Sequence, residues 1–285
     1  MTVLVTGATG NVGSSVLREL ARRGVPARAF VRDPAANVPD GVEVATGDFD
    51  DTASIEAALE GVDRVFLSSA DSPRKVEQEA AVIDRAAGVE LLVKASTAGA
   101  RAGSPLPPFD WHGRIEEHLR RSGVPHVVLA SGFYMTNLLA AAEPVRTQGV
   151  LPAPAGAGRV AMIDPRDVGA VAAAVLCGSG HDGRTYRLTG PESIAYAEIA
   201  GTLGVDYVDV PAAVAREQLV ASGLPGWLVD HLDKAFALIR EGGMEATTDT
   251  VRLLTGHDPR TFAEFARDHA DAFGLAPTAR VRQGV

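Results

Sequence analysis

The chain has 285 residues and is 46% hydrophobic, enough to bury the core of one large domain or of a domain with a smaller addition. Its formal net charge of -9 argues against nucleic acid or an anionic membrane surface as a main partner. No apolar run reaches the roughly 20 residues of a membrane span, and the first residues lack the basic flank of a secretory signal. The single cysteine, Cys177, excludes an intrachain disulfide and is expected to be buried. We therefore expect a cytoplasmic protein.

A glycine-rich turn follows the first apolar segment. Residues 3–13 predict a strand, a tight turn and the start of a helix, with glycines at 7, 10 and 13. Glycines at this spacing let the chain turn, let backbone approach a pyrophosphate and let the helix lie close to the strand. The amides at the helix start also favour a phosphate. An ordinary tight turn is the alternative. We expect a dinucleotide site formed by Gly7, Thr9, Gly10, Asn11 and Val12.

Strands alternate with helices over the first 130 residues. Strands are predicted at 26–31, 42–46, 64–67, 90–95 and 126–130, and helices from Thr52, at 75–87 and from Asp110 to about 121, with Thr52 and Asp110 as expected N-caps. Such alternation predicts right-handed βαβ units and a parallel sheet. The expected fold class is α/β, with a doubly wound parallel sheet and a smaller, partly interleaved α/β portion at the C-terminal end.

The pattern is looser beyond Gly132. Helices are predicted at 133–142, 165–176, 196–203, 212–222, 227–240 and 261–273, strands at 184–188 and 207–210, and a loop at 149–158. Residues after Pro277 show no periodicity and are expected to be frayed. We expect a nucleotide-binding portion over residues 1–131 and a smaller substrate-binding portion over 132–285, with strands returning to the sheet near 160–190.

Residues at the carboxyl ends of the strands are the expected cofactor contacts, because ligands of doubly wound sheets bind there. After the second strand, the planar fork of Arg32 suits the 2′-phosphate of NADP, whereas Asp33 could hold the ribose hydroxyl of NAD. Both could instead be solvent-facing turn residues. We favour NADP(H) over NAD(H).

The tips of the next three strands complete the expected cofactor site. Asp48 is placed to meet the adenine amino group with Phe49 beside the ring, and capping of the following helix is an equal alternative for Asp48. Small residues further along leave room for the middle and the nicotinamide end of the cofactor, and they are Ser68, Ser69, Ala70 and Ser96.

These motifs together resemble the NmrA-like branch of the atypical short-chain dehydrogenases/reductases. The matching segments are 6–13, 31–33, 47–48, 111–116, 122–125, 132–137, 163–168 and 186–192. The resemblance covers most of the chain and implies a Rossmann fold. It also implies either NAD(P)H-dependent reduction of compounds such as quinones and azo dyes, or redox sensing without catalysis.

The sequence departs from the typical family in two places. Typical short-chain dehydrogenases use a Tyr-x-x-x-Lys pair on the helix after the fifth strand, where the tyrosine exchanges a proton with the substrate. All four tyrosines of this chain lie outside that helix, and His112 stands where some family reductases carry lysine. Many relatives also have Leu-Arg-Pro where this chain has Leu-Ala-Ser at 129–131, which leaves pocket contacts near Ser131 open.

His112 is the candidate catalytic acid, because histidine titrates near neutrality and the helix should face the nicotinamide end. A packing or phosphate-bridging role is the alternative. Glu116, one turn further on, could orient the imidazole or form a structural pair with Arg120. Lys94 lies in an apolar strand, so its charge needs a partner or a cleft; it could approach the cofactor or extend to solvent at the sheet edge.

Aromatic residues point to the substrate side. An aromatic wall suits a flat apolar ligand, and an ordinary helix packed on the sheet is the alternative. The expected substrate contacts are Trp111, Phe133, Tyr134 and Asn137.

We expect an NADPH-dependent oxidoreductase that transfers hydride to a quinone, an azo compound or a polyketide-like aromatic. Hydride transfer needs mainly positioning, so a missing Tyr-Lys pair does not exclude it. A non-catalytic NADP-binding redox-sensing regulator is the alternative, and a nucleotide-sugar epimerase or dehydratase is a weaker third. The expected partner is a small apolar substrate, with no metal, nucleic acid or membrane, and a homo-oligomer stays open.

Overall fold

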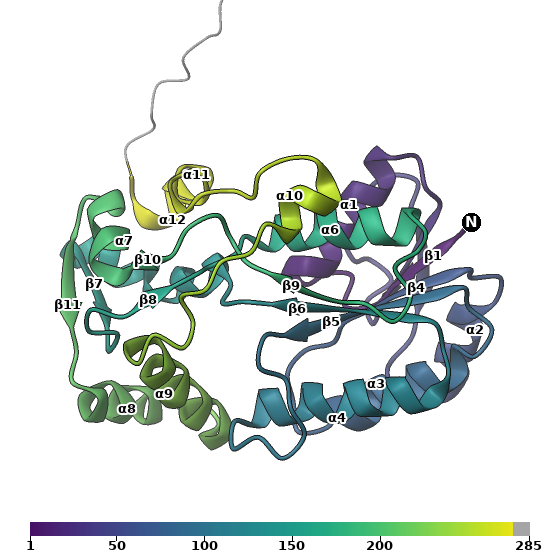
Figure 1. Ribbon diagram of the computed structural model, residues 1–285, viewed down its shortest axis with the longest axis horizontal. Coiled ribbons are helices and arrows are strands. Elements are labelled where there is room, and N and C mark those ends of the chain that lie inside the picture. The colour runs from purple at the N-terminus through teal and green to yellow at the C-terminus, as the bar shows by residue number, and fades with distance from the viewer. Residues whose placement is uncertain (276–285) are drawn as a thin grey trace, which may run out of the picture. The chain divides into compact units, whose positions relative to one another are not determined.

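The computed structural model describes residues 1–275 (Figure 1). The prediction for the tail after Pro277 lies outside these residues. The chain forms two compact units: unit 1 comprises Met1–Gly132, Pro165–Thr189 and Thr248–Pro259, and unit 2 comprises Phe133–Asp164, Gly190–Thr247 and the residues from Arg260 onward. The second portion expected over 132–285 is therefore not continuous, because residues 165–189 and 248–259 belong to unit 1.

Unit 1 is built on a seven-stranded sheet in which every neighbouring pair is parallel. Its order is β3-β2-β1-β4-β5-β6-β9, with β1 at Val3–Val5, β2 at Ala27–Val31, β3 at Glu43–Thr46, β4 at Arg64–Leu67, β5 at Leu91–Thr97, β6 at His126–Ser131 and β9 at Thr185–Leu188. The central strands are buried apolar runs, as expected where helices cover both faces. The strand expected at 184–188 does join the sheet, beside β6.

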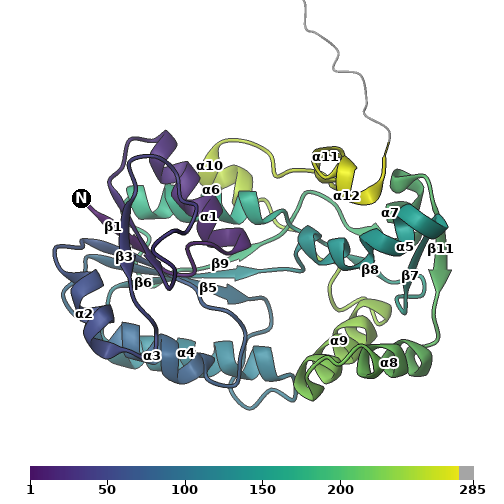
Figure 2. The ribbon, with the colours of Figure 1, turned by 180° about the vertical axis from the view of Figure 1, so that it is seen from behind.

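Helices cover both faces of this sheet (Figures 1 and 2). One layer holds α1 at Asn11–Arg22, α6 at Pro165–Cys177 and α10 at Thr250–Thr255, and the other holds α2 at Thr52–Leu59, α3 at Lys75–Arg85 and α4 at Pro107–Ser122. Helices α1 and α6 pack so closely that a Cβ on Gly169 would lie 2.5 Å from Cβ of Ser15. Cys177, the last residue of α6, is exposed, so the prediction that it is buried was wrong.

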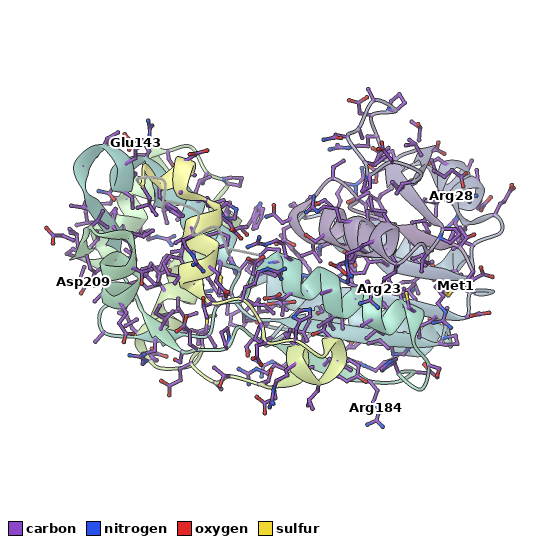
Figure 3. The ribbon with its side chains drawn as sticks, turned by 90° about the horizontal axis from the view of Figure 1, so that it is seen from above. Met1, Arg23, Arg28, Glu143, Arg184 and Asp209 are labelled. Atoms are coloured by element: carbon purple, nitrogen blue, oxygen red, sulfur yellow. The ribbon has the colours of Figure 1, made fainter. Side chains whose placement is uncertain are left out.

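Helices α2 and α4 do not begin with the N-cap residues predicted from the sequence. Asp51, not Thr52, caps α2, and its carboxylate accepts the amide hydrogen of Ala53 at 3.1 Å. Helix α4 begins at Pro107 rather than after Asp110, because proline needs no amide partner in the first turn. At the other end of α2, Arg28 of β2 (Figure 3) donates to the carbonyl oxygens of Ala58 at 2.7 Å and Glu60 at 2.8 Å.

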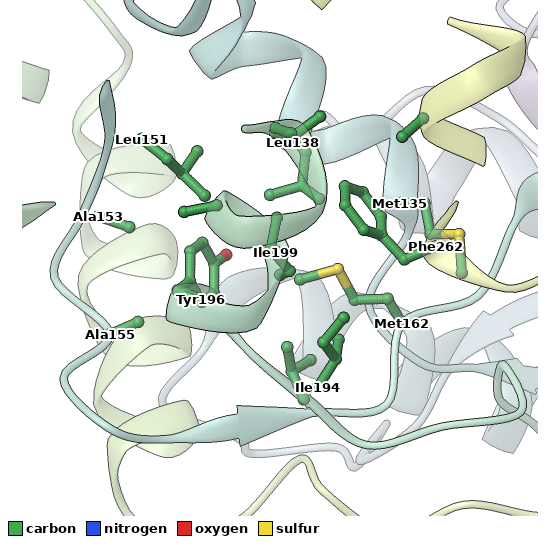
Figure 4. Packing of buried hydrophobic residues seen from close by; sticks show 14 of the residues in the cluster. Met135, Leu138, Leu151, Ala153, Ala155, Met162, Ile194, Tyr196, Ile199 and Phe262 are labelled. Carbon is green, nitrogen blue, oxygen red and sulfur yellow. The ribbon is translucent and has the colours of Figure 1, made fainter. Parts of the chain in front are cut away.

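Unit 2 has two small sheets and several helices. Strand β7 at Val150–Ala153 pairs in parallel with β11 at Asp206–Asp209, and β8 at Arg159–Val160 pairs antiparallel with β10 at Ile194–Ala195. The helices are the 3-10 helix η1 at Met135–Ala141, α5 at Ala142–Gln148, α7 at Tyr196–Leu203, α8 at Ala212–Ala221, α9 at Gly226–Arg240, α11 at Phe262–Asp268 and α12 at Ala270–Phe273. Figure 4 shows their core, where Met135, Leu138, Tyr196 and Phe262 meet.

Three predictions in unit 2 were wrong. The expected loop at 149–158 contains β7, which is held by pairing with a strand more than 50 residues away. The expected helix at 133–142 is a 3-10 helix followed by α5, which carries Pro144 in its first turn. The expected helix at 261–273 is interrupted at His269, whose ring stacks on Phe265 with the ring centres 4.0 Å apart.

No helix within residues 1–275 combines the length and the apolar character needed to cross a membrane. In the same range, no group of three or more histidine, cysteine, aspartate or glutamate side chains is arranged to hold a metal ion.

Candidate functional site

The glycine turn between β1 and α1 has a backbone that side chains would obstruct. Gly7 has a positive φ of 59°, and a Cβ there would lie 2.8 Å from the carbonyl oxygen of Ser68. A Cβ on Gly13 would lie only 2.2 Å from the carbonyl oxygen of Gly7. Gly10 is in an ordinary extended conformation, and its Cβ would meet only Gly7 O at 3.2 Å. Helix α1 can therefore begin directly against the turn.

The start of α1 is open to an anion. Gly10 is the N-cap and supplies no capping side chain, and the first turn has no acidic residue. The positive end of the helix dipole is thus not offset by a carboxylate in that turn. Thr9, Gly10 and Asn11 are exposed, whereas the side chain of Val12 is buried, so Val12 can offer a ligand only its backbone. This arrangement fits the pyrophosphate of a dinucleotide.

The side chain of Thr6, which was not among the residues predicted for the site, joins the tips of β1 and β4. The hydroxyl of Thr6 donates to the carbonyl oxygen of Ser68 at 2.8 Å and accepts the amide hydrogen of Ser68 at 2.9 Å. Thr6 is 1% exposed, so this link is internal. It places Ser68 directly against Gly7, as the close approach at Gly7 also requires.

Asp33 after β2 and Asp48 after β3 each bind backbone within their own turn. Arg32 and Asp33 are exposed, and the Asp33 carboxylate accepts the amide hydrogen of Ala35 at 2.9 Å. The Asp48 carboxylate accepts the amide hydrogen of Asp50 at 2.9 Å, so Asp48 forms a turn and does not cap α2. Phe49 is half-buried and meets Phe30 edge to face, with ring centres 5.6 Å apart.

Three charged side chains are buried between α3 and β5, and we call Lys75, Glu79 and Lys94 the charge cluster. Lys75 is 2% exposed, and Glu79 and Lys94 are 0% exposed. The two carboxylate oxygens of Glu79 lie 3.1 Å from Nζ of Lys75 and 3.0 Å from Nζ of Lys94. Ser69 donates its hydroxyl to Glu79 at 2.8 Å and accepts from Lys75. Two buried cations thus share one buried anion.

His112 of α4 lies next to the charge cluster. Its Nδ1 is 3.2 Å from Nζ of Lys94, and its Nε2 is 4.0 Å from Oδ1 of Asp71. Burial first, and then the positive charges of Lys94 and Lys75, hold the pKa of His112 well below its ordinary value of 6.5. His112 is therefore neutral at pH 7. The sequence-based choice of His112 as an acid rested on a pKa near neutrality. Its environment instead lowers that pKa.

Two roles predicted from the sequence do not match the structure: Glu116 does not orient the imidazole, and Lys94 does not lie at a sheet edge. Glu116 accepts the hydroxyl hydrogen of buried Ser96 at 2.5 Å and pairs with Arg120 at 3.4 Å, so it holds Ser96 rather than the imidazole. Lys94 is not at a sheet edge, because β5 lies between β4 and β6, with Leu67 and Val128 opposite Lys94. Its charge is met by Glu79 and by the carbonyl oxygen of Ala95.

The expected substrate contacts are divided between the two units. Trp111 is a buried residue of α4 in unit 1. Phe133 and Tyr134 are half-buried and Asn137 is exposed, and all three belong to unit 2. Ala70, expected near the middle of the cofactor, is exposed at the end of β4.

Lys75, Glu79 and Asp71 were not selected from the sequence. The chain has 27 lysine and arginine residues, of which only Lys75, Lys94 and Lys234 are lysine. Two of these three lysines are buried in the charge cluster. Two features of the sequence could have indicated the cluster. Lysine is scarce in this chain, and Lys75 and Glu79 lie one helical turn apart shortly after a strand tip.

The first 203 residues match the model of the NmrA-like family. The chain belongs to the NmrA-like family. It is 37% identical to an NAD(P)H azoreductase of Xenophilus azovorans, over 96% of this chain and 100% of that protein. It is 33% identical to quinone oxidoreductase 2 of Escherichia coli K12, over 92% of this chain and 96% of that protein.

Structure gives the same assignment. A crystal structure of an NADPH-dependent quinone oxidoreductase from Escherichia coli, complexed with NADPH, superposes with a TM-score of 0.82 at 32% identity, covering 93% of this chain and 98% of that one. The family resemblance and the Rossmann-type sheet expected from the sequence are thus confirmed. This NmrA-like protein is an oxidoreductase with the NAD(P)-binding fold of its family.

Proposed function

We propose that the chain binds NADPH and catalyses transfer of its hydride to a flat apolar acceptor, a quinone or an azo compound. The observation that carries the proposal is the glycine turn, where side chains are excluded at Gly7 and Gly13 and the start of α1 has no acidic residue. The acceptor class is supported by the relatives, which are named as an NAD(P)H azoreductase and a quinone oxidoreductase.

The residues of unit 1 have separate tasks in this reaction. The amides at the start of α1 bind the pyrophosphate, and Arg32 binds the 2′-phosphate. When bound, the dihydronicotinamide supplies the hydride. The reduced acceptor also needs a proton, and the Nε2–H of neutral His112 is the group we assign to donate it.

Replacing Arg32 by alanine is expected to weaken NADPH binding about 10- to 100-fold, because a charge-assisted contact to phosphate contributes about 1.5–3 kcal/mol. NADH has no 2′-phosphate, so its dissociation constant should change less than about twofold. Fluorescence titration of both cofactors measures the two constants in the same variant. Equal losses for NADPH and NADH would remove Arg32 from the phosphate site.

Replacing His112 by alanine is expected to lower kcat with a quinone roughly 100-fold, the usual loss when a general acid is removed. NADPH affinity should stay within about twofold, since no cofactor contact is assigned to the imidazole. His118→Ala is a matched control on the same helix, because His118 is a partly exposed residue paired with Asp84 at 2.6 Å. A kcat unchanged by His112→Ala would make His112 a packing residue.

The proposed function is tested by NADPH consumption with a panel of quinones and azo dyes, with NADPH and NADH binding measured in parallel. Turnover with members of the panel supports the proposal. Tight NADPH binding without turnover on any acceptor would contradict it and would favour a redox-sensing role. Failure to bind either cofactor would contradict the glycine turn as a pyrophosphate site.

A further inference from the structure

A neutral imidazole is a poor acid when it acts alone. Loss of the Nε2 proton from neutral His112 would leave an imidazolate unless a proton reached Nδ1 at the same time. The environment of His112 keeps the ring neutral at pH 7, so an imidazolium is not the proton source. A second donor to Nδ1 is therefore needed for His112 to act as proposed above.

Lys94 is the donor that faces Nδ1. Its Nζ lies 3.2 Å from Nδ1, and an ammonium group has only donors, so the interaction runs from Lys94 to the ring nitrogen. Accepting at Nδ1 fixes the remaining ring proton on Nε2. Nε2 points toward Asp71, whose carboxylate is partly exposed, with its side chain 46% accessible. The imidazole therefore connects a buried ammonium with a partly exposed carboxylate.

We propose that Lys94, held by Glu79, is the positioning and proton-supplying residue of His112: it fixes the Nε2–H tautomer and donates a proton to Nδ1 as Nε2–H is given to the reduced acceptor. This inference rests on the proposed reductase function. In the step, the Nε2–H and Lys94 Nζ–H bonds break, and an acceptor–H bond and an Nδ1–H bond form. Lys94 is left as a neutral amine, and both electrons come from NADPH as hydride.

The resting state returns when one proton from solvent reaches Nε2 on the side of Asp71. The Nδ1 proton then goes back to the amine of Lys94, so each turnover takes up one solvent proton and nothing else is oxidised or reduced. Asp71 lies 4.0 Å from Nε2 and 3.3 Å from Nζ of Lys75. It is thus the carboxylate placed to guide that proton to the ring.

The surrounding charges suit a lysine that can give up a proton. From α3, Glu79 stabilises the Lys94 ammonium and Lys75 opposes it, and from α4, His112 and the carboxylate of Glu116 face it. Burial, the largest effect, and the charge of Lys75 lower the pKa of Lys94 from its ordinary 10.5 despite the carboxylates. The activity that depends on the Lys94 ammonium is therefore lost as pH rises through this lowered pKa.

The first test reads the ring directly and needs no turnover. In full-length protein labelled with ¹⁵N-histidine, the imidazole nitrogens of His112 should show a protonated Nε2 and an unprotonated Nδ1 between pH 6 and 8. In Lys94→Met, which leaves a charge-balanced Lys75–Glu79 pair, the pKa of His112 should rise and the tautomer preference should weaken. A wild-type proton on Nδ1, or an imidazolium at pH 7, would overturn the proposal.

The second test compares pH profiles of kcat with a quinone. Wild-type kcat should show no inflection at the His112 pKa, whereas kcat of Lys94→Met should fall about tenfold per pH unit above the His112 pKa measured by NMR in that variant. NADPH affinity should stay within about twofold. Lys234→Met, at an exposed lysine of unit 2, is the matched control and should retain the wild-type profile.

The outcomes separate this inference from the proposed function. Wild-type protein that reduces no acceptor contradicts the proposed function, while the NMR measurement still decides the tautomer and its dependence on Lys94. Wild-type turnover combined with a wild-type pH profile in Lys94→Met overturns the inference and leaves the reductase function intact.

Discussion

Replacing Gly13 by alanine is expected to abolish NADPH binding and to lower the free energy of unfolding by about 1–3 kcal/mol, the usual cost of overpacking. The new Cβ would lie 2.2 Å from the carbonyl oxygen and 2.7 Å from the carbonyl carbon of Gly7. Both are backbone atoms, so the turn itself has to move away from α1. Moving the turn displaces the amides that we assign to the pyrophosphate.

Gly10→Ala separates the two effects. Its Cβ would meet only Gly7 O at 3.2 Å in an ordinary backbone conformation, so stability should change little while NADPH binding falls at least about tenfold. Gly201→Ala in α7 has open space and should bind NADPH as the wild type does. Thermal unfolding and NADPH titration of the three variants measure both quantities. Wild-type binding by Gly13→Ala would show that the pyrophosphate is placed elsewhere.

Replacing Glu79 by glutamine is expected to lower the free energy of unfolding by about 3–5 kcal/mol at pH 7, because two buried ammonium groups lose their shared carboxylate. Lys94→Met should cost much less, since it removes one cation and leaves the Lys75–Glu79 pair. The double variant Glu79→Gln/Lys94→Met should regain part of the loss, as Lys75 still has Asp71 at 3.3 Å and the carbonyl oxygen of Ser69 at 2.8 Å.

The pH dependence of Glu79→Gln has a definite sign. Without the carboxylate, the folded-state pKa of Lys94, which is already lowered, falls further below its unfolded value of about 10.4, and the raised pKa of Lys75 falls as well. The unfolded chain then binds more protons than the folded one over that interval, so stability rises with pH between neutrality and about pH 10. Chemical denaturation of the single and double variants at pH 7 and 9 tests this. Additive losses in the double variant would show that Glu79 and Lys94 are not coupled.

Unit 1 is assembled from three segments that are far apart in the sequence, so its full extent could not be predicted from local patterns taken in chain order. The alternation of strands and helices over the first 130 residues predicted the sheet, and strands were expected to return to it near 160–190, but the helix at 165–177 and residues 248–259 were not assigned to this unit. Helix α6 and strand β9 instead complete unit 1, because α6 packs on α1 through Gly169 and Ser15 while β9 pairs with β6. These are contacts between distant segments, and no local pattern encodes them.

The sequence by itself determined the glycine turn, because the positive φ of Gly7 and the close approach of Gly13 to the Gly7 carbonyl are steric demands that arise within a few residues and that glycine meets. It also offered His112 as a candidate acid, but it did not determine the protonation state of the ring. Only the tertiary structure decided that state, by burying His112 of α4 and bringing the charges of Lys94 of β5 and Lys75 of α3 close to it. The reason is physical: turn sterics act between neighbours in the chain, whereas the charge and dielectric that set a buried pKa come from side chains on separate elements.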